Sequence, residues 1–299
     1  MAEQLPSPQL RSLVEEAQQA IAAAAARKTL PLPYAAPDRR PNPAVETSDR
    51  IRAGAFGFAA ALLLACALLF GGGFHGRVLD NPLDTGAFAG FAWPAVGVAL
   101  LASAVFSALP HQLSSRRQRA ATPWALLAAA LYSCAMALSA GFLPLPAALV
   151  ATAASVLALA GVSRLNAQTA RNQLERWGTD APLSLMAGLG LVFSLQLWCA
   201  AAGWNFTENR AAVLIGAGIM ALAAAVFAHS ERGRHALATG FGLALLAAGI
   251  HGWLAASLPL WGSATWAGLA LLVVLCAENR RYQITHAEHR LQRGEELDF

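Results

Sequence analysis

Residues 182–203 read PLSLMAGLGLVFSLQLWCAAAG, a stretch of apolar and small residues that contains no charged side chain. Its length matches the roughly 20 residues that an α-helix needs to cross a hydrocarbon core about 30 Å thick. The same pattern recurs along the chain. We therefore expect an all-α integral membrane protein with eight transmembrane helices, over residues 53–74, 87–109, 123–142, 145–163, 182–203, 211–229, 236–257 and 260–277.

The composition also indicates that the protein lies in a membrane. The chain has 299 residues, of which 57% are hydrophobic and 13% are charged, and its mean hydropathy is +0.47. Soluble globular domains carry roughly 25% charged residues. No Lys, Arg, Asp or Glu lies near the centre of any of the eight stretches. Since charges within the membrane mark ion paths and proton relays, coupling to protons or sodium through a carboxylate is not expected.

The basic residues predict the orientation. All 21 Lys and Arg except Arg77 and Arg210 fall in the two tails, at the start of the first span, or in alternate loops. Basic residues concentrate on the cytoplasmic side of membrane proteins. We therefore expect both termini in the cytoplasm. The single lysine, Lys28, and the abundance of alanine suggest a GC-rich bacterial genome, and hence a multi-pass protein of the bacterial inner membrane.

A weak internal repeat occurs at an offset of about 115 residues. Leu258-Pro259-Leu260 repeats Leu143-Pro144-Leu145, and Arg232 and Arg234 repeat Arg117 and Arg119. A duplication would give two parallel four-helix halves. Because the first and fifth spans do not keep the offset, chance similarity among Ala/Leu-rich helices is the alternative. Pro123, Pro146, Pro182 and Pro259 lie near the starts of spans, where the first turn of a helix tolerates proline, whereas Pro94 lies deeper and predicts a kink.

The chain divides into four segments by composition. Residues 1–29 follow the cap Ser7-Pro8 with one apolar stripe, which predicts a cytoplasmic amphipathic helix. Residues 30–50 form a Pro-rich linker, residues 51–278 the transmembrane domain, and residues 279–299 a charged cytoplasmic tail. We expect the last span to continue as a helix through about Arg293. The first helix either lies on the bilayer surface or docks a protein partner.

Polar and aromatic residues gather in the outer half of the spans. Gln196 and His251 are the prominent polar residues within spans, and six of the eight tryptophans fall in the same half. These residues form either an interfacial aromatic belt or an outward-facing pocket. The candidate ligand-binding residues of such a pocket are Gln196, His251, Trp198, Trp204, Trp253 and Glu208.

No catalytic residues, metal site or cofactor are expected. A bis-histidine haem needs a second histidine within the membrane beside His251, and the other histidines lie near span ends or in the tail. The four cysteines are far apart and contain no CxxC pair, which indicates small buried hydrophobic residues. His286 and His289 share a helix face but have no third ligand beside them.

Three functions remain open. The first is a non-catalytic membrane subunit or scaffold of a larger complex, which binds a protein partner through its N-terminal or C-terminal cytoplasmic helix. The second is a transporter or channel for a neutral or amphiphilic small molecule. The third is a membrane redox or lipid-modifying enzyme. The bilayer is the expected environment in each case, and no nucleic acid partner is expected.

Overall fold

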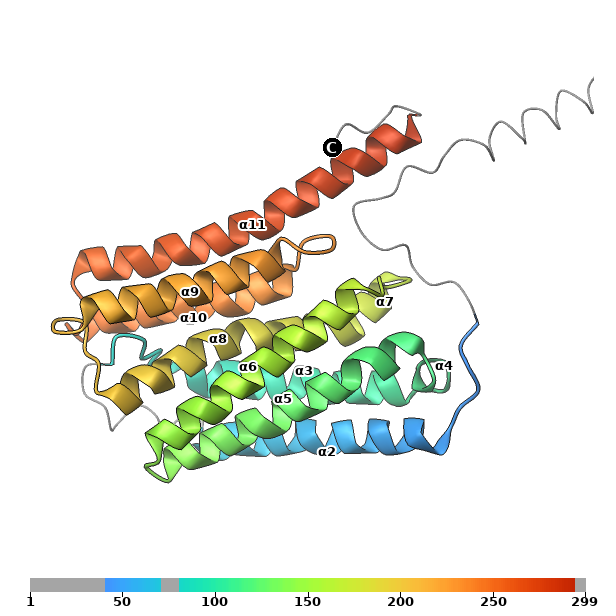
Figure 1. Cartoon of the computed structure of the whole chain (residues 1–299), viewed down its shortest axis with the longest axis horizontal. Helices are drawn as coiled ribbons and strands as arrows, with labels where there is room; N and C mark the ends of the chain where they lie inside the picture. The colour runs from blue at the N-terminus through green and yellow to red at the C-terminus, as the bar shows by residue number, and fades with distance from the viewer. Residues whose placement is uncertain (1–40, 71–80, 294–299) are drawn as a thin grey trace, which may run out of the picture. The chain divides into compact units, whose positions relative to one another are not determined.

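The computed structural model describes residues 41–70 and 81–293. The helix expected over residues 1–29 and most of the linker expected over residues 30–50 lie outside the described residues. The described residues up to His286 belong to one compact unit. Helices without a strand make up its regular structure (Figure 1).

Eight long helices account for most of the described chain. They are α2 (Thr47–Phe70), α3 (Phe88–Ala108), α5 (Arg116–Ala140), α6 (Pro144–Asn166), α8 (Ala181–Ala202), α9 (Arg210–Ala228), α10 (His235–Leu254) and α11 (Leu260–Gln292). Two short helices, α4 (Pro110–Leu113) and α7 (Gln173–Glu175), and one π-helix, η2 (Arg176–Asp180), lie between them. Each of the eight is long and apolar enough to cross a membrane.

The helices match the expected spans, with two differences in their starts. Helices α2 and α5 begin at Thr47 and Arg116, earlier than apolarity alone predicts. Consequently Pro123 lies inside α5, and not in its first turn as expected. The prediction failed because Arg117 and Gln118 are polar and yet buried within the bundle. Pro94 lies inside α3, and α11 continues to Gln292, both as expected.

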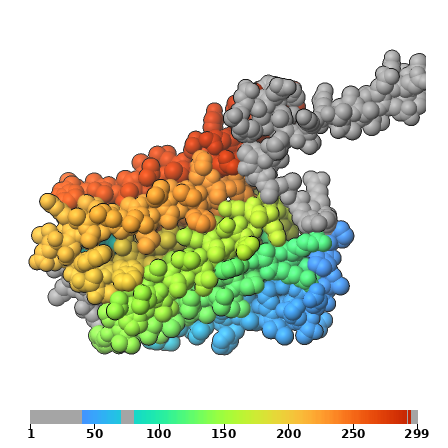
Figure 2. Space-filling model, viewed as in Figure 1, coloured from blue at the N-terminus to red at the C-terminus, as the bar shows by residue number. Residues whose placement is uncertain are grey.

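Helix α8 lies at the centre of the unit. Contacts join α2 to α3 and α5, α5 to α6, and α8 to both α6 and α10. Of the most apolar part of α8, 72% is buried, against 28% for α9. The exposed side of α9 carries a stripe of large apolar side chains, Ile215, Ile219, Leu222 and Val226. Figure 2 shows one face of the molecule, to which α5, α6, α9 and α11 contribute.

Glycine permits the close approach of α8 and α10. A Cβ atom on Gly188 would meet the carbonyl oxygen of Leu237, and one on Gly240 would lie 2.6 Å from the carbonyl oxygen of Leu185. The backbones therefore touch where neither residue has a side chain. Without a hydrophobic driving force between helices in lipid, such close packing is a principal source of association.

The arginine-rich loops meet at one end of the bundle. Asp49 in α2 accepts hydrogen bonds from Arg52 and from Arg119 of α5, at 2.6 Å each. Arg52 also donates to the carbonyl oxygen of Leu113, after α3. We call this end, where α2, α5, α8 and α10 begin, the arginine-rich end. Among the described residues, arginines from the start of α2 and from the loop between α3 and α5 thus lie at the same end, as the sequence predicts.

We expect Gly188→Ala to destabilise the protein, because the new methyl group would press against backbone atoms that cannot move without shifting α10. Overpacking of this kind costs about 1–3 kcal/mol. Gly218→Ala in α9 is the control, since a Cβ there meets nothing within 4 Å. The midpoint of thermal unfolding in mild detergent should fall for Gly188→Ala and not for Gly218→Ala. Equal midpoints for the two variants would show that the α8–α10 contact is not close.

Candidate functional site

Four charged side chains are buried together at the arginine-rich end. They are Arg117 near the start of α5, Asp180 at the end of η2, and Glu231 and Arg234 in the turn between α9 and α10. None is more than 7% exposed. We call these four residues the charge cluster. Two positive and two negative charges balance, as expected for ions removed from water.

Asp180 is the centre of the charge cluster. One carboxylate oxygen accepts a hydrogen bond from Nη2 of Arg117. The other lies 3.8 Å from Nη1 of Arg234. Arg234 in turn places Nη2 2.9 Å from Oε2 of Glu231. A single aspartate thus faces two arginines that come from distant parts of the chain.

Neutral side chains extend the charge cluster to two further helices. Oδ1 of Asn166, the last residue of α6, accepts hydrogen bonds from Nε of Arg234 at 2.8 Å and from Oγ of Ser230 at 3.3 Å. Nη1 of Arg234 donates to Oγ of Ser184 in α8 at 3.4 Å. The network therefore connects α5 and α6, from the first four long helices, to α8 and the α9–α10 turn, from the last four.

The backbone around Asp180 is locally irregular. Residues Arg176–Asp180 form a π-helix, and the N–H of Ala181 bonds to the carbonyl oxygen of Arg176. Pro182 follows, and it cannot supply the N–H that an α-helix would direct to Gly178. The wider turn accommodates this missing donor. Gly178 also leaves room for the ring of Phe106, which a Cβ atom would approach to 2.8 Å.

The α9–α10 turn is strained. Glu231 has a φ of 51°, a left-handed conformation that is unfavourable for a residue with a side chain. Gly233, at a φ of 84°, lies where a Cβ atom would meet the carbonyl oxygen of Ala277 in α11. The carbonyl oxygen of Glu231 accepts a hydrogen bond from Nε of Arg280 at 3.0 Å. Contacts with α11 thus hold the turn in the conformation that buries Glu231 and Arg234.

Burial dominates the electrostatics of this turn. It raises the pKa of Glu231, and the positive charge of Arg234 opposes that rise. Burial also lowers the pKa of Arg234, and Asp180 and Glu231 oppose the change. The side chains of the charge cluster do not use all of their hydrogen-bonding atoms. Nε and Nη1 of Arg117, Oδ2 of Asp180 and Oε1 of Glu231 are buried and have no hydrogen-bond partner among the described residues.

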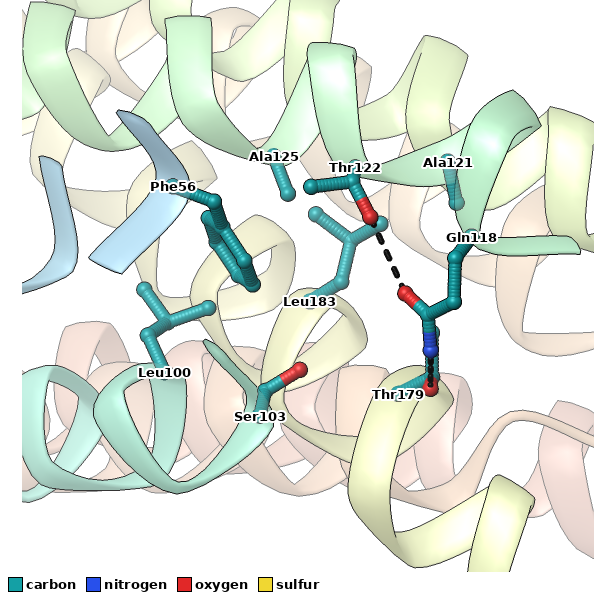
Figure 3. Close-up of a pocket in the computed structure, with 9 residues that line it drawn as sticks. All are labelled: Phe56, Leu100, Ser103, Gln118, Ala121, Thr122, Ala125, Thr179 and Leu183. Carbon is teal, nitrogen blue, oxygen red and sulfur yellow. Dashed lines mark hydrogen bonds between the residues drawn. The ribbon is translucent and has the colours of Figure 1, made fainter. Parts of the chain in front are cut away.

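A cavity lies beside the charge cluster, between α2, α3, α5 and α8 (Figure 3). Its volume is about 10 Å³, which is the space for one water-sized sphere. One side is apolar, with Phe56, Leu100, Ala121, Ala125 and Leu183, and the other is polar, with Ser103, Gln118, Thr122 and Thr179. Gln118 directly follows Arg117 in the chain, and Thr179 directly precedes Asp180.

Further along the bundle, hydroxyl groups replace charges. The hydroxyl of Tyr132 lies 2.8 Å from Oγ of Ser155, which lies 2.8 Å from Oγ of Ser194. Ser194 donates to the carbonyl oxygen of Gly190 at 2.9 Å. The ring of Tyr132 packs against those of Trp93 and Phe193, with centroids 5.1 and 6.4 Å apart. The hydroxyls therefore connect α5, α6 and α8 without an ionised group.

The six residues predicted to line an outer pocket lie towards the end opposite the charge cluster, and two of them meet one segment. Asn81 donates to the carbonyl oxygen of Gln196 at 3.0 Å, and Nε2 of His251 lies 3.5 Å from Oδ2 of Asp84. The residues between Asn81 and Gly86 thus connect Gln196 to His251. Nδ1 of His251 also lies against Gly86, where a Cβ atom would come within 2.6 Å of it.

The other four residues of that group have separate surroundings. Trp198 donates from Nε1 to Oγ1 of Thr152 in α6 at 2.9 Å. Trp204 packs partly buried against the core, whereas Trp253 is 56% exposed. Glu208 is exposed and accepts a hydrogen bond from Nδ2 of Asn205 at 3.1 Å. The cavity of Figure 3 includes none of the six.

The residues of the charge cluster lie in or beside loops that the sequence predicts to be solvated, and its burial was therefore missed. The available signal was the presence of Asp180 and Glu231, together with Glu175, in loops whose other charged residues are arginines. An acidic residue there has arginine neighbours with which it can pair, but the partners of Asp180 lie 63 residues before it and 54 residues after it.

No three His, Cys, Asp or Glu residues come together as a possible metal site within residues 41–70 and 81–293.

Taken together, eight helices long and apolar enough to span a membrane, packed into one unit, are the pattern of a multi-pass α-helical membrane protein. Comparisons of this chain with protein-family models, with curated proteins and with solved structures find no match. The assignment of the candidate site therefore depends on the geometry of the charge cluster alone.

Asp180→Asn should destabilise the protein strongly, because it leaves Arg117 and Arg234 buried with one carboxylate fewer. Breaking a buried pair costs about 3–5 kcal/mol. Arg281→Gln is the control: the side chain of Arg281 is 64% exposed, and exposed pairs contribute about 0–1 kcal/mol. Urea or thermal unfolding in mild detergent measures both changes.

Removing both partners should cost less than removing one. In the double variant Arg117→Met with Asp180→Leu, no uncompensated charge remains between α5 and η2, and Arg234 keeps Glu231. If the losses of unfolding free energy in the single variants Arg117→Met and Asp180→Leu simply added up in the double variant, Arg117 and Asp180 would not interact.

Proposed function

We propose that the protein is a non-catalytic membrane subunit or scaffold, with its arginine-rich end and both termini in the cytoplasm of a bacterium. The charge cluster is the observation that carries the proposal. It joins the first four long helices to the last four through buried, paired ions. Separating the two sets of helices at this end would leave those ions unpaired, which favours one fixed arrangement.

The packing of the interior supports a static role. Alanines are frequent in the interior: in α5 and α6, which pack against each other, Ala125, Ala128, Ala147 and Ala158 are almost fully buried. Close packing of small residues lets backbones touch and leaves little room for a solute. At mid-bundle, the hydroxyl groups of Tyr132, Ser155 and Ser194 form hydrogen bonds with one another.

The surface provides regions for a partner. In addition to the stripe on α9, α11 exposes Leu271, Leu272 and Leu275. Lipid or another membrane subunit would cover these apolar faces. Outside the bundle, the two tails remain the proposed docking segments for a cytoplasmic protein, as the amphipathic pattern of residues 1–29 and the charged continuation of α11 suggest.

The proposal predicts that the chain, extracted in mild detergent, has a protein mass well above its own 31.2 kDa and contains a second polypeptide in fixed proportion. Deleting residues 1–45, or residues 287–299, should release that polypeptide. Light scattering coupled to gel filtration gives the mass. If the intact chain and both truncations all have the mass of the chain alone, the protein is not a subunit of a complex.

A transporter for a small neutral molecule is the second candidate. One observation favours it: the cavity of Figure 3, which has one polar wall, lies beside the charge cluster, and opening of the cluster would expose it. A gate must open and expose Thr122, which is 2% exposed in this arrangement.

Accessibility of a cysteine distinguishes the two candidates. With its four native cysteines replaced by serine, the variant Thr122→Cys should resist a membrane-impermeant thiol reagent applied from the cytoplasmic side if the protein is a scaffold. Ala167→Cys, at an exposed position after α6, is the control that should react. Labelling of both positions would favour the transporter.

A further inference from the structure

The cavity between α2, α3, α5 and α8 is mostly apolar, and Ser103, Gln118, Thr122 and Thr179 form its one polar wall. All four side chains are more than nine-tenths buried, and they come from α3, α5 and η2. In Figure 3 the hydroxyl of Ser103 points into the space between these elements. Unlike Ser107 on the same helix, which donates to the carbonyl oxygen of Ala104, Ser103 makes no side-chain hydrogen bond within the described residues.

The geometry points to a site for one bound water molecule, held by Ser103, Gln118 and Thr179. Gln118 donates one amide hydrogen to Oγ1 of Thr179 at 2.8 Å, and its Oε1 accepts from Thr122 at 2.9 Å. An amide NH₂ has two hydrogens and a hydroxyl has one. The second amide hydrogen of Gln118 and the hydroxyl hydrogens of Ser103 and Thr179 thus remain to be satisfied.

A water molecule matches both the size and the chemistry of this site. A buried water typically makes about three hydrogen bonds, and it needs two to four polar partners in a space of at least about 10–15 Å³. A water oxygen accepts two of the remaining hydrogens, and its own hydrogens can bond to the lone pairs of Thr122 or Ser103. Leaving such groups buried and unpaired would cost about 1–3 kcal/mol each.

The surrounding charge argues against a cation. Four oxygen-bearing side chains resemble the ligands of a sodium ion, but none of them is ionised. Arg117 adjoins Gln118 in the chain, and the carboxylate of Asp180 already faces two arginines. A positive ion removed from water here would have no carboxylate of its own to compensate its charge. A neutral molecule carries no such penalty.

The bound water gives α3 its polar connection to the arginine-rich end of the bundle. Through it, Ser103 of α3 is joined to Gln118 of α5 and to Thr179, the neighbour of Asp180. This inference does not depend on whether the protein is a scaffold, because a trapped water needs no open path.

The first test is a structure of the intact protein in lipid at a resolution that reveals buried waters. We expect a peak within hydrogen-bonding distance of Oγ of Ser103 and Oγ1 of Thr179. An empty cavity, in a map that shows waters at other buried sites, would overturn the inference.

Thermal unfolding of two variants is the second test. Ser103→Val fills the cavity with methyl groups and displaces the water, so the unfolding midpoint should fall by several degrees more than in the control Ser107→Ala. A rise in the midpoint would show that the cavity is dry, since filling a dry cavity adds favourable contacts. Replacing sodium by choline should leave the wild-type midpoint unchanged. A fall in choline would overturn the inference by making this a cation site.

Discussion

The charge cluster imposes the constraint on which the rest of the structure depends. Ions removed from water must be paired, and the ions of Arg117, Asp180, Glu231 and Arg234 find their partners within one another's reach. Each helix that supplies a member, or a neutral neighbour such as Asn166, is thereby fixed at that end. Elsewhere the helices meet through small residues and hydroxyl groups, which permit close contact but impose weaker directional requirements.

The two ends of the bundle therefore have different chemistry. At the arginine-rich end, buried ions, a π-helix and a strained turn occur together, a combination that is frequent where proteins have specific tasks. At the opposite end, the segment from Asn81 to Gly86 contacts the main-chain carbonyl of Gln196 and the side chain of His251, once each. A scaffold needs its helices to keep their places, and the charge cluster is the part of the structure that best meets this requirement.

Much of the fold could be predicted from the sequence, because a bilayer requires long apolar helices and the eight stretches supply them. The start of α5 could not, since Arg117 and Gln118 look like loop residues until their partners are known. The position of Asp180 between two arginines was missed for the same reason: pairing across more than 50 residues leaves no local pattern. Of the residues predicted to line an outer pocket, Gln196 and His251 contact the same segment, residues 81–86. Nothing in the sequence marks Asp84 of that segment as a neighbour of His251.

The most direct test is the distance between two spin labels across the arginine-rich end, one at His111 in α4 and one at Tyr282 in α11. Both side chains are exposed, and the four native cysteines would be replaced by serine. Pulsed electron–electron double resonance in lipid bilayers gives the distribution of distances between the two labels. A fixed scaffold predicts one narrow distribution. Two separate distances in the resting protein would contradict it, because the charge cluster would then open and close.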